Sequence, residues 1–258
     1  MSGKWNLWAL VFLGLIGLAL QAPLQAQEVQ SQPTQVDIRI WNPTLSGEIQ
    51  TPSQTGIQLQ DDLGLRPSTG IVITAKVKSS EKTAYGFQYE TIEHNNSRTL
   101  SRNITYEGVT FNANTSVSAN LRYAGYEGIY YRTLTKSEKG ELNFVGSIKY
   151  IVFSSSLKGV NDTTAAKDIS VPLPTIGLEG KASVGQNAEV FGRIAGLDFK
   201  MGGTRASVLD LYGGARIKIQ DWKAGLAYRY ETIRLIDQNG SKGEIKESGP
   251  EFVLSKEF

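Results

Sequence analysis

Few residues of the 258-residue chain combine into a set that could do chemistry. The single histidine, His94, lies in the stretch IEHNNS, beside Glu93 and three positions before Ser97. A histidine with a carboxylate and a hydroxyl can activate a nucleophile for hydrolysis. Along a strand, however, residues three apart point to opposite faces, so His94 and Ser97 would not meet. We therefore interpret His94 as a solvated residue at a loop edge and expect no catalytic residues.

Metal and phosphate chemistry have equally little support in the sequence. Asp61 and Asp62 form an acidic pair in LQDDLGL (59–65), but two carboxylates are too few for a Ca²⁺ site. The chain has no cysteine, and its glycine-rich stretches GLEGKASVG and GGTRAS do not match a phosphate-binding loop. We expect no metal ion and no cofactor.

Residues 1–26 predict a secretory signal peptide, which leaves one domain over 27–258. Lys4 supplies the positive charge, an apolar run follows, and Leu24 and Ala26 occupy the positions before the cleavage site. An uncleaved membrane anchor is the alternative, although the run is short for a span of about 20 residues. An exported chain without cysteine is typical of a bacterial envelope protein. The formal net charge of +2 does not favour a nucleic-acid partner.

The mature chain alternates apolar and polar residues almost throughout, which predicts strands. We expect ten strands, with eight or twelve as alternatives. Their predicted ranges are 36–49, 70–79, 83–94, 117–133, 141–154, 171–184, 188–199, 204–219, 223–235 and 244–258. Tight turns alternate with longer loops near 50–69, 95–116 and 155–170, and the loop 95–116 either hides a hairpin or extends its flanking strands. This layout predicts an all-β fold, an up-and-down antiparallel transmembrane β-barrel.

One parity of each predicted strand is apolar and the other carries charge, as where Tyr228 and Tyr230 flank Arg229. A soluble β-barrel or sandwich shows the same alternation. The signal peptide, the aromatic residues near strand ends and the small residues on the apolar faces favour lipid outside and charge inside. The predicted lumen charge network consists of Arg39, Lys76, Glu90, Arg122, Lys149, Glu179, Lys181, Glu189, Arg193, Asp210, Arg216, Arg229 and Glu231.

One strand departs from the rule. Leu121 and Tyr123 share a parity with Glu127, and a carboxylate facing lipid would be costly. We expect Leu121 and Tyr123 to face lipid and a β-bulge near Gly125 or Gly128 to turn Glu127 inward, or Glu127 to lie near the periplasmic rim.

The chain ends in the alternating strand FVLSKEF. Phe252, Leu254 and Phe258 resemble the C-terminal signal that barrel-assembly machinery reads, from which Lys256 departs. More widely, the chain resembles small Gram-negative outer-membrane β-barrel proteins that lack a defined activity. The stretches that carry this resemblance are WNPTLSGEIQT (41–51), LQDDLGL, VPLPTIGLEGKASVGQNAEVFGRIAGL (171–197) and the final strand. The resemblance covers nearly the whole mature chain and implies a fold and a location, not a chemistry.

These observations predict a monomer in the bacterial outer membrane. Its expected partners are outer-membrane lipid and lipopolysaccharide, with the barrel-assembly machinery during biogenesis. Long side chains of balanced charge can fill a narrow ten-strand lumen, so we expect a salt-bridged plug and a structural or loop-mediated interaction role. A narrow passive pore for small polar solutes is the alternative. An envelope enzyme ranks third, because the sequence lacks the residue sets of known outer-membrane proteases, lipid A deacylases and phospholipases.

Overall fold

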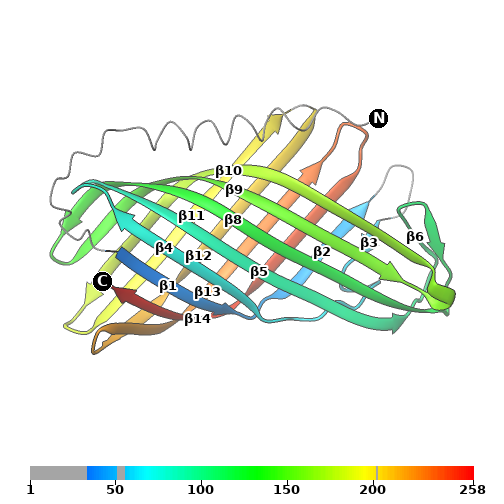
Figure 1. Cartoon of the computed structure of the whole chain (residues 1–258), viewed down its shortest axis with the longest axis horizontal. Helices are drawn as coiled ribbons and strands as arrows, with labels where there is room; N and C mark the ends of the chain where they lie inside the picture. Colours follow the sequence, from blue (N-terminus) through cyan, green and yellow to red (C-terminus); the bar gives the residue numbers. More distant parts are fainter. Residues whose placement is uncertain (1–33, 51–55, 202) are drawn as a thin grey trace, which may run out of the picture. The chain divides into compact units, whose positions relative to one another are not determined.

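The computed structural model of the chain describes residues 34–50, 56–201 and 203–258. The predicted signal peptide and the start of the predicted domain lie outside these ranges. Ten antiparallel strands form a closed ring in up-and-down order, and β14 pairs back onto β1 (Figure 1). The barrel strands are β1 (Thr34–Trp41), β4 (Gly70–Lys78), β5 (Thr83–Thr99), β8 (Ser116–Ser137), β9 (Gly140–Lys158), β10 (Thr164–Val184), β11 (Ala188–Met201), β12 (Thr204–Ile219), β13 (Trp222–Ile236) and β14 (Lys242–Glu257). The predicted fold class is confirmed.

The predicted first strand is broken into two. β1 pairs with the C-terminal half of β14, and β2 (Thr44–Gln50) pairs with its N-terminal half. Pro43 lies at the break, where it has no N–H to offer a ladder. Gly249 faces this bend: a Cβ there would lie 2.3 Å from the Asn42 carbonyl oxygen, so only glycine admits the close approach. β2 also pairs with the short β3 (Ile57–Gln58).

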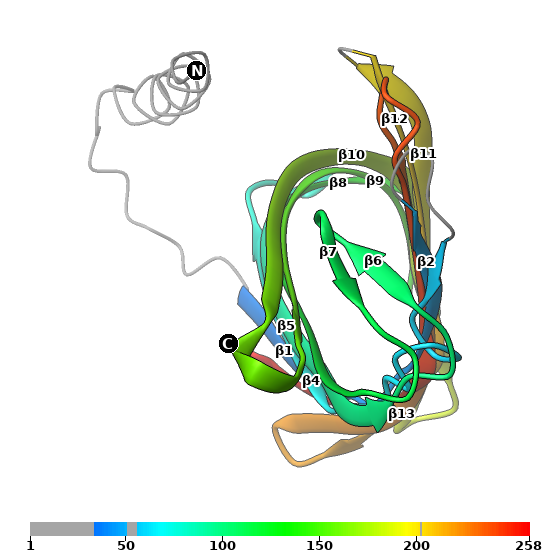
Figure 2. The same ribbon diagram turned by 90° about the vertical axis from the view of Figure 1, so that its right-hand side faces the viewer.

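The predicted loops 95–116 and 155–170 are largely strand. β9 and β10 continue to a connection of residues 159–163, which contains the 3₁₀ turn η1 (Val160–Asp162). In the first segment both alternatives occur, because β5 and β8 lengthen and a hairpin of β6 (Ile104–Tyr106) and β7 (Val109–Phe111) lies between them. This hairpin does not join the wall; it lies within the ring in the end-on view (Figure 2).

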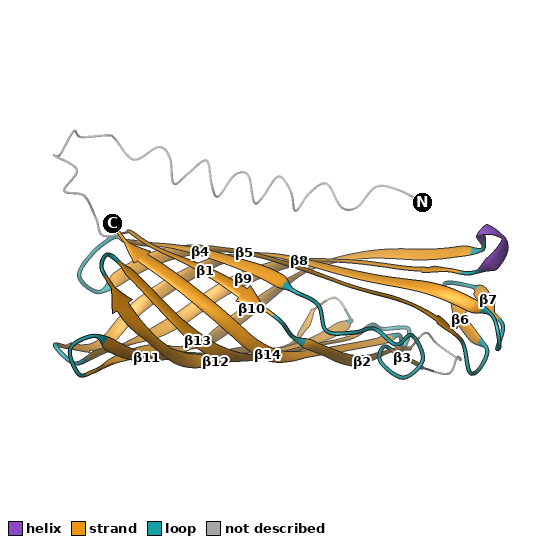
Figure 3. Cartoon of the chain, turned by 90° about the horizontal axis from the view of Figure 1, so that it is seen from below, coloured by secondary structure: helices purple, strands orange, loops and turns teal. Residues whose placement is uncertain are grey.

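Both described termini lie at one end of the barrel, where the Phe258 N–H donates to the Thr34 carbonyl at 2.8 Å (Figure 1). The η1 turn lies at the opposite end (Figure 3). Short turns join the strands at the terminal end, which is therefore the periplasmic end of the barrel. Among the described residues, no helix is both long and apolar enough to cross a membrane.

The outer face of the barrel carries a band of large apolar side chains. Its exposed members include Ile38, Ile40, Ile71, Ile73, Tyr85, Phe87, Tyr126, Ile148, Tyr150, Ile176, Ile194, Ile217, Leu226, Tyr228 and Phe252. The neighbouring residues on each strand point inward and include the buried charged groups, together with small or aliphatic residues such as Val72, Ala84 and Val253. A continuous apolar exterior around a charged interior is the arrangement that a bilayer requires, because the side chains that meet hydrocarbon must be apolar.

The expectation for the fourth barrel strand is wrong. Glu127 does point inward, with 2 % of its surface exposed, but no bulge is needed, because β8 alternates regularly through this region and its register shift lies at Thr133/Thr135. Leu121 and Tyr123 point inward as well and are buried. The outward residues of β8 are instead the other parity, such as Tyr126.

The polarity of the wall reverses on the extracellular side of the apolar band. There the outward residues of β5 are polar, as at Glu93 and Asn95, whereas Ile92 points inward. The inward residues form an apolar core: Leu45, Ile57, Leu59, Leu63, Leu65, Ile92, Leu100, Ile104, Tyr106, Phe111, Val117, Ala119, Leu121, Tyr123, Ile151, Phe153, Leu157, Ala165, Leu173, Ala206, Val208 and Ile233. The extracellular half of the barrel is therefore built like a water-soluble protein.

Candidate functional site

Twelve of the thirteen predicted network residues face the lumen. Eight of them are buried: Arg39, Glu90, Lys149, Arg193, Asp210, Arg216, Arg229 and Glu231. Four nearer the periplasmic end are half-buried: Lys76, Glu179, Lys181 and Glu189.

Arg122 does not belong to the network. It is exposed on the outer face of β8, where its partner in the ladder is Glu93 of β5. The polarity reversal explains the misplacement, because outward residues at this height are polar.

Arg229 lies at the centre of the network and is fully buried. Its Nε and Nη2 donate to the two carboxylate oxygens of Asp210 at 2.9 and 3.1 Å, and its Nη1 donates to Glu90 at 2.9 Å. The guanidinium also lies 4.6 Å from the ring centroid of Trp41. Because these groups come from β13, β12, β5 and β1, one side chain joins different sides of the lumen.

Lys149 of β9 completes this central layer. Its Nζ lies 2.6 Å from Glu90 and 2.5 Å from Glu231, and the Tyr123 hydroxyl donates to the same Glu90. Glu90 therefore meets at least three donors, whereas among the described residues Glu231 accepts a hydrogen bond from Lys149 alone and its Oε2 has no hydrogen-bond partner. Charged groups can be buried together when their remaining hydrogen-bonding positions are filled, as they are at Glu90.

A second layer lies next to it toward the periplasm. Arg193 Nη2 donates to Glu127 at 2.6 Å, and the Ser147 hydroxyl donates to the same carboxylate oxygen at 2.5 Å. Arg39 Nη2 donates to the Gln88 side-chain oxygen at 2.7 Å. Gln88 was not identified from the sequence, although it shares the inward parity of Glu90 on the same strand.

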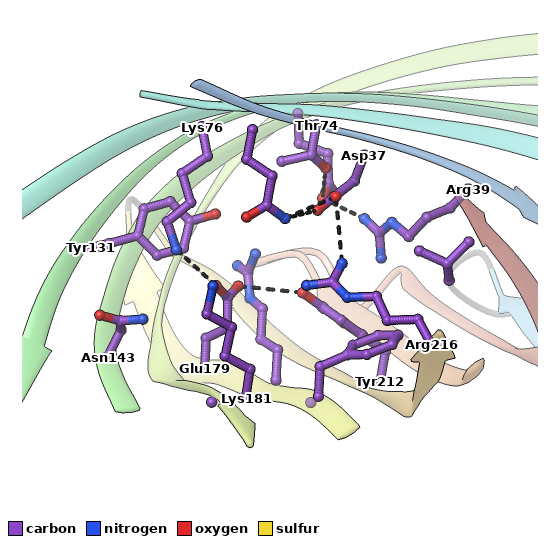
Figure 4. Close-up of a pocket in the computed structure, with 17 residues that line it drawn as sticks. Asp37, Arg39, Thr74, Lys76, Tyr131, Asn143, Glu179, Lys181, Tyr212 and Arg216 are labelled. Atoms are coloured by element: carbon purple, nitrogen blue, oxygen red, sulfur yellow. Dashed lines mark hydrogen bonds and ion pairs between the residues drawn. The ribbon is translucent and has the colours of Figure 1, made fainter. Parts of the chain in front are cut away.

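The periplasmic end opens into a polar vestibule (Figure 4). Lys76 Nζ lies 3.2 Å from Glu179 and 3.9 Å from the centre of the Tyr131 ring, and Arg216 binds Glu189 at 2.6 Å. Cavities of about 180 and 520 Å³ lie at the rim, and one of about 50 Å³ continues inward as far as the level of Arg39.

His94 is buried rather than solvated, so the expectation of a loop-edge residue is wrong. It is 1 % exposed within β5; its Nε2 lies 2.7 Å from a carboxylate oxygen of Glu247, and its Nδ1 lies 2.9 Å from the Arg66 carbonyl oxygen. The other residues considered for hydrolysis lie elsewhere. Ser97 bonds Ser118 on the exposed surface. His94 therefore holds two segments together, and its ring nitrogens have no free path to a substrate.

β4 begins at Gly70, and on the extracellular side of this residue the wall is filled by the segment 56–69, which we call the panel. Three side chains of β5 hold it through its backbone carbonyls: His94 at Arg66, the Asn96 amide at Leu63 (3.2 Å) and Arg98 at Asp61 (2.7 Å). Leu59, Leu63 and Leu65 of the panel are buried in the apolar core. The LQDDLGL stretch thus supplies a piece of barrel wall.

A buried carboxylate ties the panel to the segment before the β6–β7 hairpin. Arg102 Nε donates to Asp62 Oδ1 at 2.8 Å, and Arg102 Nη2 donates to Asp62 Oδ2. Burial favours a higher pKa for Asp62, but the hydrogen bonds from Arg102 and from the Gln58 N–H hold that pKa below its usual value. Asp62 is therefore structural. Among the described residues no three potential metal ligands cluster together.

A closed antiparallel barrel with an apolar exterior, a charged interior and short turns at one end defines a bacterial outer-membrane β-barrel protein.

No family model and no curated protein matches the chain. The solved structures that match the chain at low sequence identity include the following three outer-membrane proteins. The attachment invasion locus protein Ail of Yersinia pestis has 7 % identity and a TM-score of 0.37, covering 86 % of this chain and 98 % of its own.

The translocator domain of the autotransporter NalP from Neisseria meningitidis has 10 % identity and a TM-score of 0.44, covering 95 % of this chain and 96 % of its own. The toluene transporter TodX of Pseudomonas putida has 8 % identity and a TM-score of 0.35, covering 88 % of this chain and 90 % of its own.

Proposed function

We propose that this protein is a sealed outer-membrane barrel that acts through its extracellular surface rather than as a pore or an enzyme. The observation that carries the proposal is the double closure of its lumen. The charge network around Arg229 fills the membrane-embedded part, and the apolar core fills the extracellular part. A solute moving along the axis would have to displace both.

The charge network opposes conduction in a specific way. Among the described residues, five buried cations of the network (Arg39, Lys149, Arg193, Arg216 and Arg229) face five buried carboxylates (Glu90, Glu127, Asp210, Glu231 and Glu251), and another buried carboxylate, Glu247, contacts His94. Opening a path through the centre would separate Arg229 from Asp210 and Glu90 inside the membrane, which is costly for buried pairs. The balanced charge also gives no preference for cations or anions.

The extracellular half is suited to interaction. Paired strands extend β8, β9 and β10 away from the apolar band, and the apolar core supports them, so the loops stand on a rigid base. The tip of the β9–β10 hairpin presents Val160, which is 55 % exposed. Surrounding lipid and lipopolysaccharide are the proposed contacts of the wall, and the protein is proposed to act as a monomer.

Conductance in planar bilayers tests the sealed lumen. The folded protein, checked by its heat-dependent shift on gels, is expected to give no steady current steps. An Arg229→Ala and Lys149→Ala double variant, which shortens two central side chains, is expected to give occasional brief openings. Steady openings of the unmodified protein would refute the proposal in favour of a pore.

Photo-crosslinking on live cells tests the interaction role. A crosslinking amino acid at Val160 is expected to capture an envelope or extracellular component that the same group at Gln186, in the exposed periplasmic turn, does not capture. Equal or absent products at both sites would contradict a role for this hairpin.

A further inference from the structure

The barrel wall is interrupted at two places on the extracellular side. One interruption lies between β2 and β5, where β4 has ended, and the panel closes it as described above. The other lies between β10 and β11. Their ladder ends at the pair Ile176–Gly196, although β10 extends back to Thr164 and β11 continues beyond Gly196. Among the described residues, no backbone ladder joins 164–175 to β11. We call this second interruption the seam.

Two prolines stand at the start of the seam. Pro172 and Pro174 are paired through β9 with Tyr150 and Ile148 on one side, and their other side is the open edge. Proline has no N–H to donate and is confined in sheets to edges and bulges. The VPLPT stretch therefore prevents β11 from continuing its ladder along β10, so the seam is encoded in the sequence of the strand.

The wall at the base of the seam is apolar on both of its faces, whereas farther along the seam the outward residues are polar, as at Asp168, Ser170 and Asp198. Outward, Ile176 and Ile194 flank the last rung and are each 53 % exposed, and Ile148 and Tyr150 belong to the apolar band. Inward, Leu173 is fully buried, Val171 and Phe199 are partly exposed at the edge of the apolar core, and Ile169 is 40 % exposed although it shares a face with buried Phe153. At the base of the seam the lipid-facing surface therefore adjoins the apolar interior.

We propose that the seam is a lateral binding site for an acyl chain of an outer-leaflet lipid. The chain would leave the lipid that surrounds Ile148 and Ile176, pass between the unpaired edges of β10 and β11, and lie against Ile169, Val171 and Phe199. Burying its methylene groups against these side chains supplies the attraction. We choose an acyl chain as the occupant because the base of the seam adjoins the lipid-facing apolar band at Ile148 and Ile176. The closed panel on the other side of the barrel leaves the seam as the lateral route in the described structure.

Photolabelling in vesicles tests this site. The protein is refolded into phosphatidylcholine vesicles that contain a phospholipid with a diazirine on its acyl chain, and labelled residues are mapped by mass spectrometry. Label is expected on the inward residues Ile169, Val171 and Phe199, but not on Leu121, an inward residue on the panel side. Equal labelling of Leu121, or no label on the three seam residues, would overturn the proposal.

An engineered disulfide, which reductant can open again, provides the matched control, since the chain has no native cysteine. Thr175→Cys with Leu197→Cys places a disulfide at the rung where the ladder would continue, and Leu178→Cys with Ile194→Cys places one below the seam on an existing rung. Closing the seam is expected to reduce inward labelling about tenfold, as if roughly two methylene groups lost their burial. Reductant should restore the labelling of the inward residues, and the disulfide between positions 178 and 194 should not change it.

A water-filled seam is the contrary outcome. Ile169→Cys is expected to react slowly with a membrane-impermeant maleimide because lipid occupies the seam. Reaction as fast as that of a cysteine at exposed Ser170 would overturn the proposal. The outcome is independent of the conductance experiment. The protein could lack the acyl-chain site and still have a sealed lumen, or it could bind an acyl chain and still conduct.

Discussion

Arg229 illustrates how the lumen holds charge without solvent. Its guanidinium has three carboxylates around it, Asp210, Glu90 and Glu231, and an indole ring on one side. A buried pair of this kind adds little net stability when complete, but removal of one partner leaves an uncompensated charge. The network therefore specifies one arrangement of the lumen more than it stabilises the barrel.

Arg229→Met is expected to lower the free energy of unfolding by about 3–5 kcal/mol, because it leaves buried carboxylates unpaired. Urea-driven unfolding in lipid vesicles measures the change. Arg205→Met, which breaks the exposed pair with Asp198, is the matched control and should be nearly silent. An equal effect of both variants would contradict a special role of the central layer.

Asp62 makes a pH-dependent contribution to the extracellular structure. Its pKa in the folded protein lies below the usual 3.8, so the stability that its pairing with Arg102 contributes is present above that value and is lost as the pH falls through the folded pKa. Amide exchange protection of the panel should stay constant from neutral pH down to about pH 4 and then decrease. In Asp62→Asn the protection should be weaker at neutral pH and show no such decrease.

At the scale of elements, the wall is interrupted at two places where a ladder ends early. The panel closes the first interruption, and the seam leaves the second one open. Because β5 extends farther than β4, the β4 side of β5 has no strand partner among the described residues on the extracellular side, although its other side pairs with β8. The panel covers that side with three leucines and three hydrogen bonds to its backbone carbonyls. Between Thr164 and Thr175, β10 pairs with β9 but has no ladder in the described structure on its β11 side, where Pro172 and Pro174 lie. The two sides of the barrel therefore differ in how firmly the wall is closed.

Leu63→Ala is expected to loosen the panel without opening the barrel. Truncating a buried leucine costs about 2–5 kcal/mol, and Leu63 is one of the three leucines that anchor the panel in the apolar core. Amide exchange should accelerate across 56–69 and remain unchanged in the β12–β13 ladder. Leu134→Ala, at a position 56 % exposed, should leave both regions unaffected. Global acceleration would show that the panel is not a separate unit.

At the scale of the whole molecule, the membrane divides the barrel into two halves with inverted polarity. Within the band the wall is apolar outside and charged inside, and beyond it the wall is polar outside and apolar inside. Both halves follow from one rule, that apolar side chains avoid water, applied to different surroundings. Closure of the ring by β14 on β1 joins the halves into one structure.

The role of the C-terminal residues as an assembly signal stays a prediction. These residues lie in or directly after the strand that closes the ring. Phe252 is exposed to lipid, Leu254 shares its face, and Phe258 N–H completes the pairing with Thr34. Lys256, which departs from the usual pattern, lies about 5 Å from the rings of Trp222 and Phe258. Phe258→Ser is expected to slow appearance of the folded, heat-modifiable form in cells while leaving its melting temperature nearly unchanged. Unchanged assembly kinetics would argue against the signal.

The sequence by itself indicated ten strand segments, their order and their inward parity within the membrane, because alternation is a local pattern that backbone geometry enforces. It did not show the break of the first strand at Pro43 or the strands that continue into 155–170, and it left the structure of 95–116 open. It could not show where the polarity reverses. Arg122 and Leu121 were misplaced for that reason, since the same alternation has the opposite meaning beyond the bilayer. His94 was misplaced because the strand was expected to end there, whereas β5 continues to Thr99.

Only the tertiary structure decided what closes the lumen and what leaves the wall open. The contacts of Arg229 with Glu90 join residues 139 positions apart, and His94 and Glu247 are separated by 153. No local pattern encodes such pairs, because they arise from the diameter and stagger of the closed ring. The ladder that ends at Ile176 is likewise fixed by the registers of three strands together, with Pro172 and Pro174 as its only local sign.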